Sequence, residues 1–110
     1  MKTTIINNLE WQVAETGRMT WDDAVKYAAS LGDGWRLPTV TELVSLIDYE
    51  NFDPAIDTTI FPDCCYKYWS GSPYAYYSNY AWYVSFVYGA VNYYYKTNLY
   101  YVRCVREVPK

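Results

Sequence analysis

The chain has 110 residues, which is enough for one hydrophobic core but not for two. Hydrophobic residues make up 52% of it, yet so many are tyrosine that the mean hydropathy is -0.25, and the aliphatic runs are far too short to span a bilayer. A net charge of -3 and scattered basic residues argue against nucleic acid as a partner, because phosphate binding depends on clustered Lys and Arg.

The residue types that carry chemistry are few. Histidine is absent, which removes the commonest general base and metal ligand, so we expect no catalytic residue, no metal, no cofactor and a protein that is not an enzyme. Cys64, Cys65 and Cys104 cannot all pair within one chain. Reduced thiols are favoured, and a bridge from Cys104 to one of the other two is the alternative. A catalytic pair of cysteines is the weaker hypothesis, because Cys64 and Cys65 are adjacent and no base is evident.

Residues 1–10 carry one lysine and no apolar block of signal-peptide length, so we expect no signal peptide in this chain and a virion-associated or cytoplasmic location. Residues 11–14 are expected to form a short strand, and Gly17 a turn.

Two helices follow. Thr20 can cap the first, which the glycines after residue 31 end, and Thr39 with Glu42 forms a capping box for the second. The expected buried residues of the first helix are Trp21, Ala24, Val25, Ala28 and Leu31, and those of the second are Leu43, Leu46 and Ile47.

Residues 48–63 are expected to form a loop that wraps over the core, with Ile56, Ile60 and Phe61 as anchors. Its acidic residues offer oxygens for calcium, but their spacing matches no compact calcium loop, so we interpret them as solvated acids and caps. These residues are Asp48, Asp53, Asp57 and Asp63.

The pattern then changes to period two, which predicts strands over residues 68–70, 81–87, 91–95 and 100–108. Within 81–87 one alternating set is expected to pack inward and the other to look out. The inward set is Trp82, Val84 and Phe86, and the outward set is Tyr83, Ser85 and Val87. Two helices followed by a twisted antiparallel sheet define an α+β domain.

Tyrosine is concentrated in this second half, where thirteen of the fifteen lie between Tyr66 and Tyr101. Successive strand side chains point to opposite faces of a sheet, so runs such as 93–95 cannot all face one core. Many rings are therefore expected at the surface, where a large aromatic area marks a docking site. A strand-rich core with ordinary surface aromatics is the alternative, because tyrosine has a high β propensity. The tryptophans are interpreted as core and turn anchors: Trp21, Trp35, Trp69 and Trp82.

Several short motifs occur in a fixed order: Trp21 with Ala24, residues 34–39 (GWRLPT) with Glu42-Leu43, Phe61-Pro62, 68–70 (YWS), Ala81-Trp82, Gly89 and 101–106 (YVRCVR). Together they resemble the collagen-like-protein (Lcl) C-terminal domain family, over about residues 10–106. The resemblance implies a single C-type-lectin-like domain over residues 1–110. The family often has a cysteine after the tyrosine of the first helix, whereas Tyr27 is followed here by Ala28, a departure from the family's usual disulfide.

A second resemblance covers residues 68–106, which look like the variable region of diversity-generating retroelement proteins. It implies that adenine-directed mutagenesis rewrites asparagine codons, which can become Tyr, Ser, Val, Ala or Leu, and that Asn79, Asn92 and Asn98 are unmutated or fixed. The residues expected to vary and to bind ligand are Tyr74, Tyr76, Tyr77, Tyr80, Tyr83, Ser85, Val87, Tyr88, Ala90, Tyr93, Tyr94, Tyr95, Leu99 and Tyr100. The fixed frame is Trp69, Pro73, Trp82, Val84, Phe86, Gly89, Val91 and Val102.

The sequence thus favours a ligand-binding protein with a hypervariable, tyrosine-rich surface for a protein or cell-surface target. Tyrosine suits that role because it offers a large rigid contact area and an adaptable hydroxyl. An invariant adhesin or carbohydrate-binding domain is the alternative. Nucleic acid and membrane insertion are not expected, and self-association through the exposed rings stays open.

Overall fold

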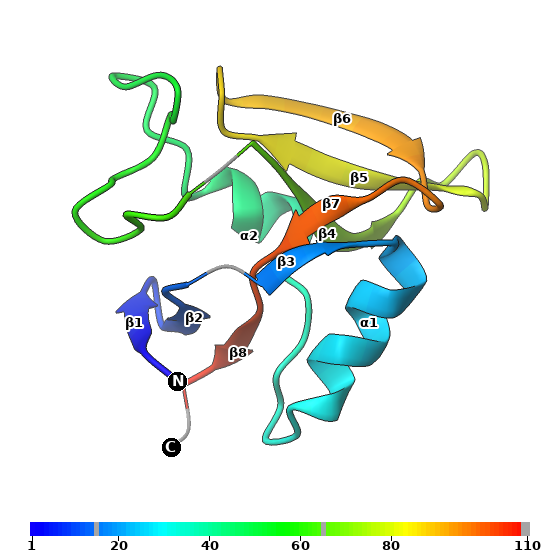
Figure 1. Ribbon diagram of the computed structural model, residues 1–110, viewed down its shortest axis with the longest axis horizontal. Coiled ribbons are helices and arrows are strands. Elements are labelled where there is room, and N and C mark those ends of the chain that lie inside the picture. Colours follow the sequence, from blue (N-terminus) through cyan, green and yellow to red (C-terminus); the bar gives the residue numbers. More distant parts are fainter. Residues whose placement is uncertain (15, 65, 109–110) are drawn as a thin grey trace.

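The computed structural model describes residues 1–14, 16–64 and 66–108. It contains two helices and two sheets, which confirms the predicted α+β class (Figure 1). The three-stranded sheet has the order β1-β2-β8, and the five-stranded sheet has the order β3-β7-β4-β5-β6. The elements are β1 Thr3–Ile6, β2 Leu9–Gln12, β3 Thr16–Met19, α1 Trp21–Ser30, α2 Val40–Val44, β4 Lys67–Pro73, β5 Tyr80–Ser85, β6 Ala90–Tyr95, β7 Tyr100–Val102 and β8 Val105–Glu107.

Pairing between distant segments explains where the predicted strands were wrong. Gly17, where a turn was expected, is instead part of β3. This strand pairs with β7, which lies far later in the sequence. The single strand expected over 100–108 is two strands, β7 and β8, that belong to different sheets. The sheet is also not wholly antiparallel, since β4 and β7 run parallel where Tyr68 faces Tyr101.

Both helices begin as the sequence predicts. The Thr20 hydroxyl accepts the Asp23 N–H at 3.3 Å, and the capping box of Thr39 and Glu42 is complete. These bonds satisfy N–H groups that the first turn leaves without partners. Val25 is an exception to the predicted buried face of α1, because it is 39% exposed.

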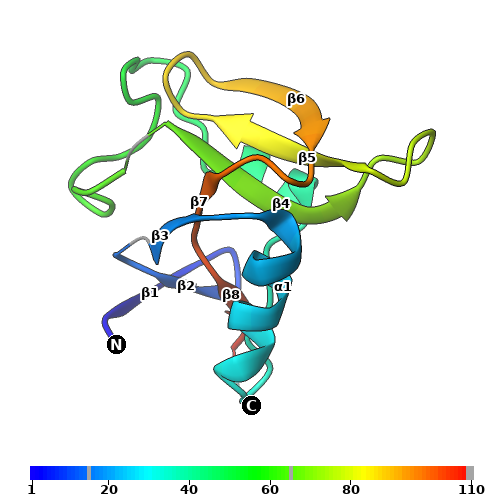
Figure 2. The same ribbon diagram turned by 45° about the vertical axis from the view of Figure 1, so that its right-hand side comes forward.

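The five-stranded sheet has a hydrophobic core on each side (Figure 2). Successive β4 residues point to opposite faces, so Trp69 packs with α1 while Tyr68 packs with α2 and the loop that follows it. Strand β5 is therefore covered on both faces at its centre. Tyr83 and Ser85, which were expected to look out, are each 8% exposed.

The tryptophans near α1 act as anchors, as predicted. The Trp21 indole N–H donates to the Ser70 carbonyl at 2.8 Å, and the Trp69 indole N–H donates to the Met19 carbonyl at 3.0 Å. The first bond joins α1 to β4, and the second joins β4 to β3. Segments far apart in sequence are thereby fixed against each other. Trp82, which was expected to pack inward, is half-buried, as Trp21 is.

The loop after α2 is attached to the end of β5. Asp53 N–H donates to the Val87 carbonyl at 2.7 Å, while Ile56 and Phe61 are each 1% exposed. The predicted anchoring is confirmed for these two residues, and Ile60 is half-buried.

The C-terminal strands bring two polar residues into the interior. Arg103 is 1% exposed and donates to the carbonyls of Gln12 and Val13, with its guanidinium 4.5 Å from the Phe61 ring. Cys104 is fully buried and has a free thiol, so the expected reduced state is confirmed for this cysteine, whereas Cys65 lies outside the described residues.

Candidate binding surface

The residues predicted to bind ligand lie on the β4–β5 loop, on β5 and β6, on the turns that flank β6 and, for Tyr100, on β7 (Figure 1). Eight of them are exposed: Tyr76, Tyr77, Tyr88, Ala90, Tyr93, Tyr94, Tyr95 and Leu99. Three are half-buried, namely Tyr74, Tyr80 and Val87. The structure thus brings most of the set to one edge of the five-stranded sheet, the edge formed by β5 and β6.

Three predicted residues are buried, so their expected outward orientation is wrong: Tyr83, Ser85 and Tyr100. Tyr100 lies 4.7 Å from Trp69 and 4.8 Å from Tyr83, measured between ring centroids. The period-two pattern predicted which face of the sheet each side chain lies on. It did not predict that α1 and its neighbours cover that face. Burial raises the pKa of the Tyr83 and Tyr100 hydroxyls, so both stay neutral at physiological pH.

A continuous group of aromatic rings lies near the β6 edge of the sheet, on the face opposite Tyr83 and Tyr100. We define the aromatic cluster as Tyr74, Tyr76, Tyr77, Tyr80, Trp82, Tyr93 and Tyr95. Tyr74 lies at its centre, stacked on Tyr93 with centroids 4.0 Å apart and edge-on to Trp82 at 5.4 Å. Such pairs are favourable beyond the area they bury, so the rings support one another without a hydrophobic layer above them.

Two hydroxyl groups of the cluster, those of Tyr74 and Tyr80, have a raised pKa and are therefore neutral at physiological pH. A hydrogen bond with Tyr95, followed by desolvation, raises the pKa of Tyr80 to about 12. A hydrogen bond with Tyr93 raises the pKa of Tyr74 in the same way. The surface therefore presents uncharged phenols that can donate or accept a hydrogen bond.

The frame of the surface is partly different from the predicted one. Trp69, Val84, Phe86 and Val102 are buried as expected, whereas Pro73 is exposed and Val91 is 41% exposed. Val91 sits on β6, all six residues of which are exposed. With Trp82 and α2 it forms a shallow apolar groove of about 250 Å³ beside the aromatic cluster, lined by Val40, Thr41, Val44, Trp82 and Val91.

A second hollow contains residues that the sequence did not indicate. Arg18, Tyr66, Lys67 and Tyr101 join the predicted Val87, Leu99 and Tyr100 around a pocket of about 410 Å³. The Lys67 ammonium lies 5.5 Å from the centroid of the Tyr83 ring and 5.6 Å from that of Tyr100. Only the pairing of β3 with β7 brings Arg18 here, and no local pattern signals that contact.

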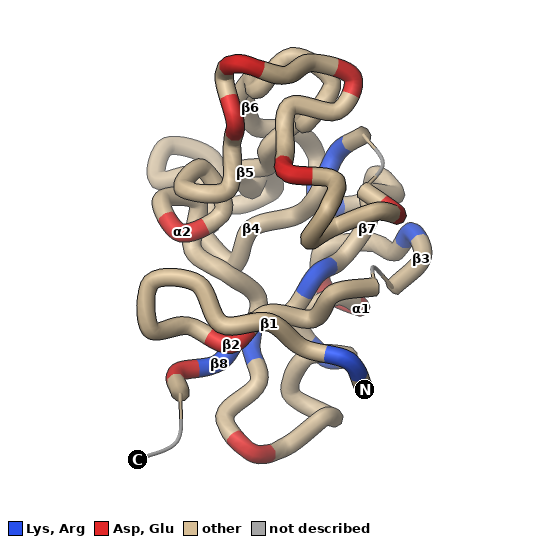
Figure 3. The backbone as a smooth tube through the Cα atoms, turned by 90° about the vertical axis from the view of Figure 1, so that its left-hand side faces the viewer, with Lys and Arg blue, Asp and Glu red and all other residues tan. Residues whose placement is uncertain are grey.

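Charge is distributed so that the aromatic surface is neutral. Residues 68–95 include no Asp, Glu, Lys or Arg, a signal in the sequence that marks the same region as the tyrosine count. Acidic residues lie instead along the loop between α2 and β4 (Figure 3). Contact with this surface therefore depends on aromatic area and hydrogen bonds more than on charge.

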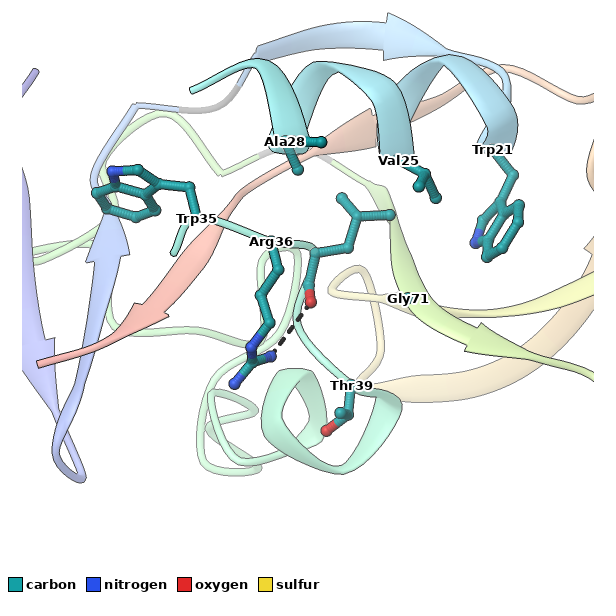
Figure 4. Close-up of a pocket in the computed structure, with 9 residues that line it drawn as sticks. Trp21, Val25, Ala28, Trp35, Arg36, Thr39 and Gly71 are labelled. Atoms are coloured by element: carbon teal, nitrogen blue, oxygen red, sulfur yellow. Dashed lines mark hydrogen bonds between the residues drawn. The ribbon is translucent and has the colours of Figure 1, made fainter. Parts of the chain in front are cut away.

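A third pocket lies under α1, away from the tyrosines (Figure 4). It has a volume of about 450 Å³ and runs from Trp21 to Trp35, past Leu37 and Gly71. Leu37 is packed tightly, since a Cβ added at Gly71 would lie 3.3 Å from its Cβ. Several residues that line this pocket belong to the motifs that carry the family resemblance, and their packing contacts give these motif residues a structural role.

Arg36 illustrates that structural role. Its guanidinium binds both carboxylate oxygens of Glu42, at 2.7 and 2.9 Å, and its backbone bridges to Val105. These hydrogen bonds hold the pKa of Glu42 below and that of Arg36 above their ordinary values. The positive charge is thus already paired and is not available to a ligand in the pocket.

The described residues contain neither a cluster of metal ligands nor a membrane-spanning helix. Among residues 1–14, 16–64 and 66–108, no three His, Cys, Asp or Glu side chains converge as metal ligands. In the same ranges, no helix has the length and apolar character needed to cross a bilayer. Burial raises the pKa of the Cys104 thiol to about 12, which opposes its use as a nucleophile.

An α+β domain whose sheet ends in an exposed tyrosine surface fits the class of binding domains. The sequence model of the Lcl C-terminal domain matches residues 4–106, and the chain belongs to that family. A search of curated proteins finds no match to the chain.

Proposed function

We propose that the protein is the ligand-binding variable protein of a diversity-generating retroelement. On this proposal a lectin-like scaffold presents a hypervariable tyrosine surface to a protein or cell-surface target and catalyses no reaction. The retroelement comes from the resemblance of residues 68–106, and the binding role is supported by the exposure of the rings.

The observation that carries the proposal is the aromatic cluster together with strand β6, all six residues of which are exposed. Tyr76 is 83% exposed and Tyr77 is 59% exposed, although tyrosine favours partial burial. A soluble monomer gains nothing in stability from rings held in water. Tyrosine is, however, the residue that recognition loops use most, because it buries a large area while losing only two torsions.

The scaffold is suited to tolerate change at these positions. The exposed tyrosines sit on loops and on an edge strand, whereas the cores depend on residues such as Trp69, Val84 and Val102. Substitution at an exposed site usually changes the free energy of unfolding by no more than about 0.5 kcal/mol. Many surfaces can thus be presented on one fold.

Burial divides the predicted variable positions into two groups. Tyr83 and Tyr100 fill the core beside α1, and Ser85 is buried, so changes at these three positions act on stability. Contact with a target falls to the exposed members, among which Tyr76, Tyr77 and Tyr93 are the ones that we expect to be energetically dominant. Loss of a central ring from such an interface typically costs about 2 kcal/mol of binding energy.

Sequencing the locus tests the retroelement. A nearly identical repeat downstream that differs only at adenines, next to a reverse transcriptase gene, is the expected result. If the repeat and the reverse transcriptase gene are not both present, the retroelement assignment is wrong, and an invariant binding domain becomes the favoured function.

The carbohydrate-binding alternative has its own test, because sugars also stack on exposed aromatic faces. A glycan array probed with and without calcium separates the two functions. Binding that requires one sugar class or calcium favours the lectin, whereas a protein target retained in calcium-free buffer favours the variable protein.

A further inference from the structure

Strand β6 forms one edge of the five-stranded sheet, with β5 as its neighbour (Figures 1 and 2). The Lys96 N–H donates to the Asn79 carbonyl at 2.9 Å, which continues the β5–β6 ladder by one residue. Backbone groups alternate along an antiparallel strand, so the even-numbered residues of β6 bond to β5. The backbone groups of Val91, Tyr93 and Tyr95 therefore point away from the sheet.

This edge lacks the features by which sheet edges are normally protected. Proteins use charges, prolines, bulges or short strands for that purpose. The opposite edge, β3, has a register shift between Thr16 and Met19 and carries Arg18. Strand β6 keeps an unbroken register with β5 over six residues, has neither charge nor proline, and is exposed at every position.

Few of the outward backbone groups have a partner. The Tyr93 N–H donates to the Asn92 side-chain oxygen at 2.8 Å, and the Tyr95 carbonyl accepts from Asn98 N–H at 3.0 Å. Within the part of the chain that the structure describes, the N–H and carbonyl of Val91, the Tyr93 carbonyl and the Tyr95 N–H bond to no other residue. They are a ready template for another strand.

We propose that β6 pairs antiparallel with β6 of a second copy of this chain, about a two-fold axis at Tyr93. In this register Tyr93 lies opposite its own counterpart, and Val91 of each copy lies opposite Tyr95 of the other. The outward backbone groups of both copies then meet in hydrogen-bonded pairs, for which the Tyr93 N–H exchanges the Asn92 side-chain oxygen for the Tyr93 carbonyl of the other copy. The pairing rests on the fold and is independent of the function proposed above.

Charge and side-chain chemistry favour a second copy as the occupant. Self-pairing places each residue opposite one from the same strand, which is unfavourable where a charge meets itself. Strand β6 has no charge, and Lys96 would face Ala90 of the other copy. The facing pairs are aromatic–aromatic and aromatic–β-branched, which are among the favourable cross-strand pairs. Because Tyr93 and Tyr95 belong to the aromatic cluster, the two clusters would join into one surface.

The first test measures the mass of the whole 110-residue protein by sedimentation velocity over a concentration series, with hydrogen exchange at both ends of that series. A monomer–dimer equilibrium is expected, with slower exchange of the Val91 and Tyr95 amides in the dimer. The Asn92 and Tyr94 amides, already bonded to β5, should be unchanged. A protein that stays monomeric up to about 1 mM overturns the proposal.

The second test reads the register with two double variants at exposed positions. Val91→Lys with Tyr95→Lys places lysines opposite lysines, whereas Val91→Glu with Tyr95→Lys places opposite charges together twice. We expect dimerisation about tenfold weaker or more for the first than for the second. Phe52→Lys, at an exposed position outside both β6 and the aromatic cluster, is the control and should dimerise like the wild type. Equal affinities for the two double variants, or a dimer that persists unchanged in both, would show that another surface pairs.

Discussion

Replacement of Gly89 by alanine should destabilise the fold by about 2 to 4 kcal/mol. Gly89 has a φ of 74°, where an L residue costs about 1 kcal/mol. A Cβ there would also lie 2.8 Å from the Cγ2 atom of Ile47, and relieving such an overlap typically costs a further 1 to 3 kcal/mol or so. Ile47 is half-buried against the core of α2, so it cannot simply turn into solvent.

Two glycine variants separate these contributions in urea unfolding at neutral pH. Gly32 also has a positive φ, of 65°, but an added Cβ meets nothing within 4 Å, so Gly32→Ala should cost about 1 kcal/mol. Gly17 has neither constraint, and Gly17→Ala should be neutral or stabilise by about 0.5 kcal/mol. If Gly89→Ala is no more destabilising than Gly32→Ala, the β5–β6 turn is not packed against Ile47.

Three further predictions concern the tyrosines and the paired carboxylate. Tyr100→Ala should lower the free energy of unfolding by about 3 kcal/mol, whereas Tyr76→Ala should change it by less than about 0.5 kcal/mol; equal losses in urea would contradict the assigned burial. Tyr95→Phe removes the hydrogen bond that raises the pKa of Tyr80 to about 12, so an ultraviolet titration should show a tyrosine ionising closer to pH 10, with Tyr76→Phe as control. Glu42 has a lowered pKa, so its contribution is complete above its ordinary value of 4.5 and is lost as the pH falls through the lowered one. Glu42→Gln should therefore cost less than about 1 kcal/mol at neutral pH, and a difference from the wild type that does not narrow in acid would refute the pairing.

The local features of the fold could be predicted from the sequence. A capping box depends on residues three apart, so Thr39 and Glu42 gave the start of α2 correctly. The helical spacing of Ala24 and Ala28 likewise identified the buried side of α1. What failed was non-local, since β3 is a strand because it pairs with β7, and residues 16–19 carry no sign of that partner.

The candidate site was predictable to the same degree. Alternation placed Tyr83 and Val84 on opposite faces of β5, and the structure agrees, but both faces are covered. Val91 was assigned to the fixed frame that builds the sheet, yet it lies on an edge strand and is 41% exposed. Periodicity identifies the face of each side chain, whereas exposure depends on which other elements pack there.

The central claim is that the exposed tyrosines are one sample of a changing surface. Deep sequencing of this coding region across a population of the source tests it most directly. We predict substitutions concentrated at the codons of the exposed positions, such as Tyr76, Tyr77 and Tyr93, and explained by changes at template adenines, with the codons of Trp69 and Val84 unchanged. Substitutions spread evenly over surface and core codons, or a surface that is invariant in every member, would contradict it.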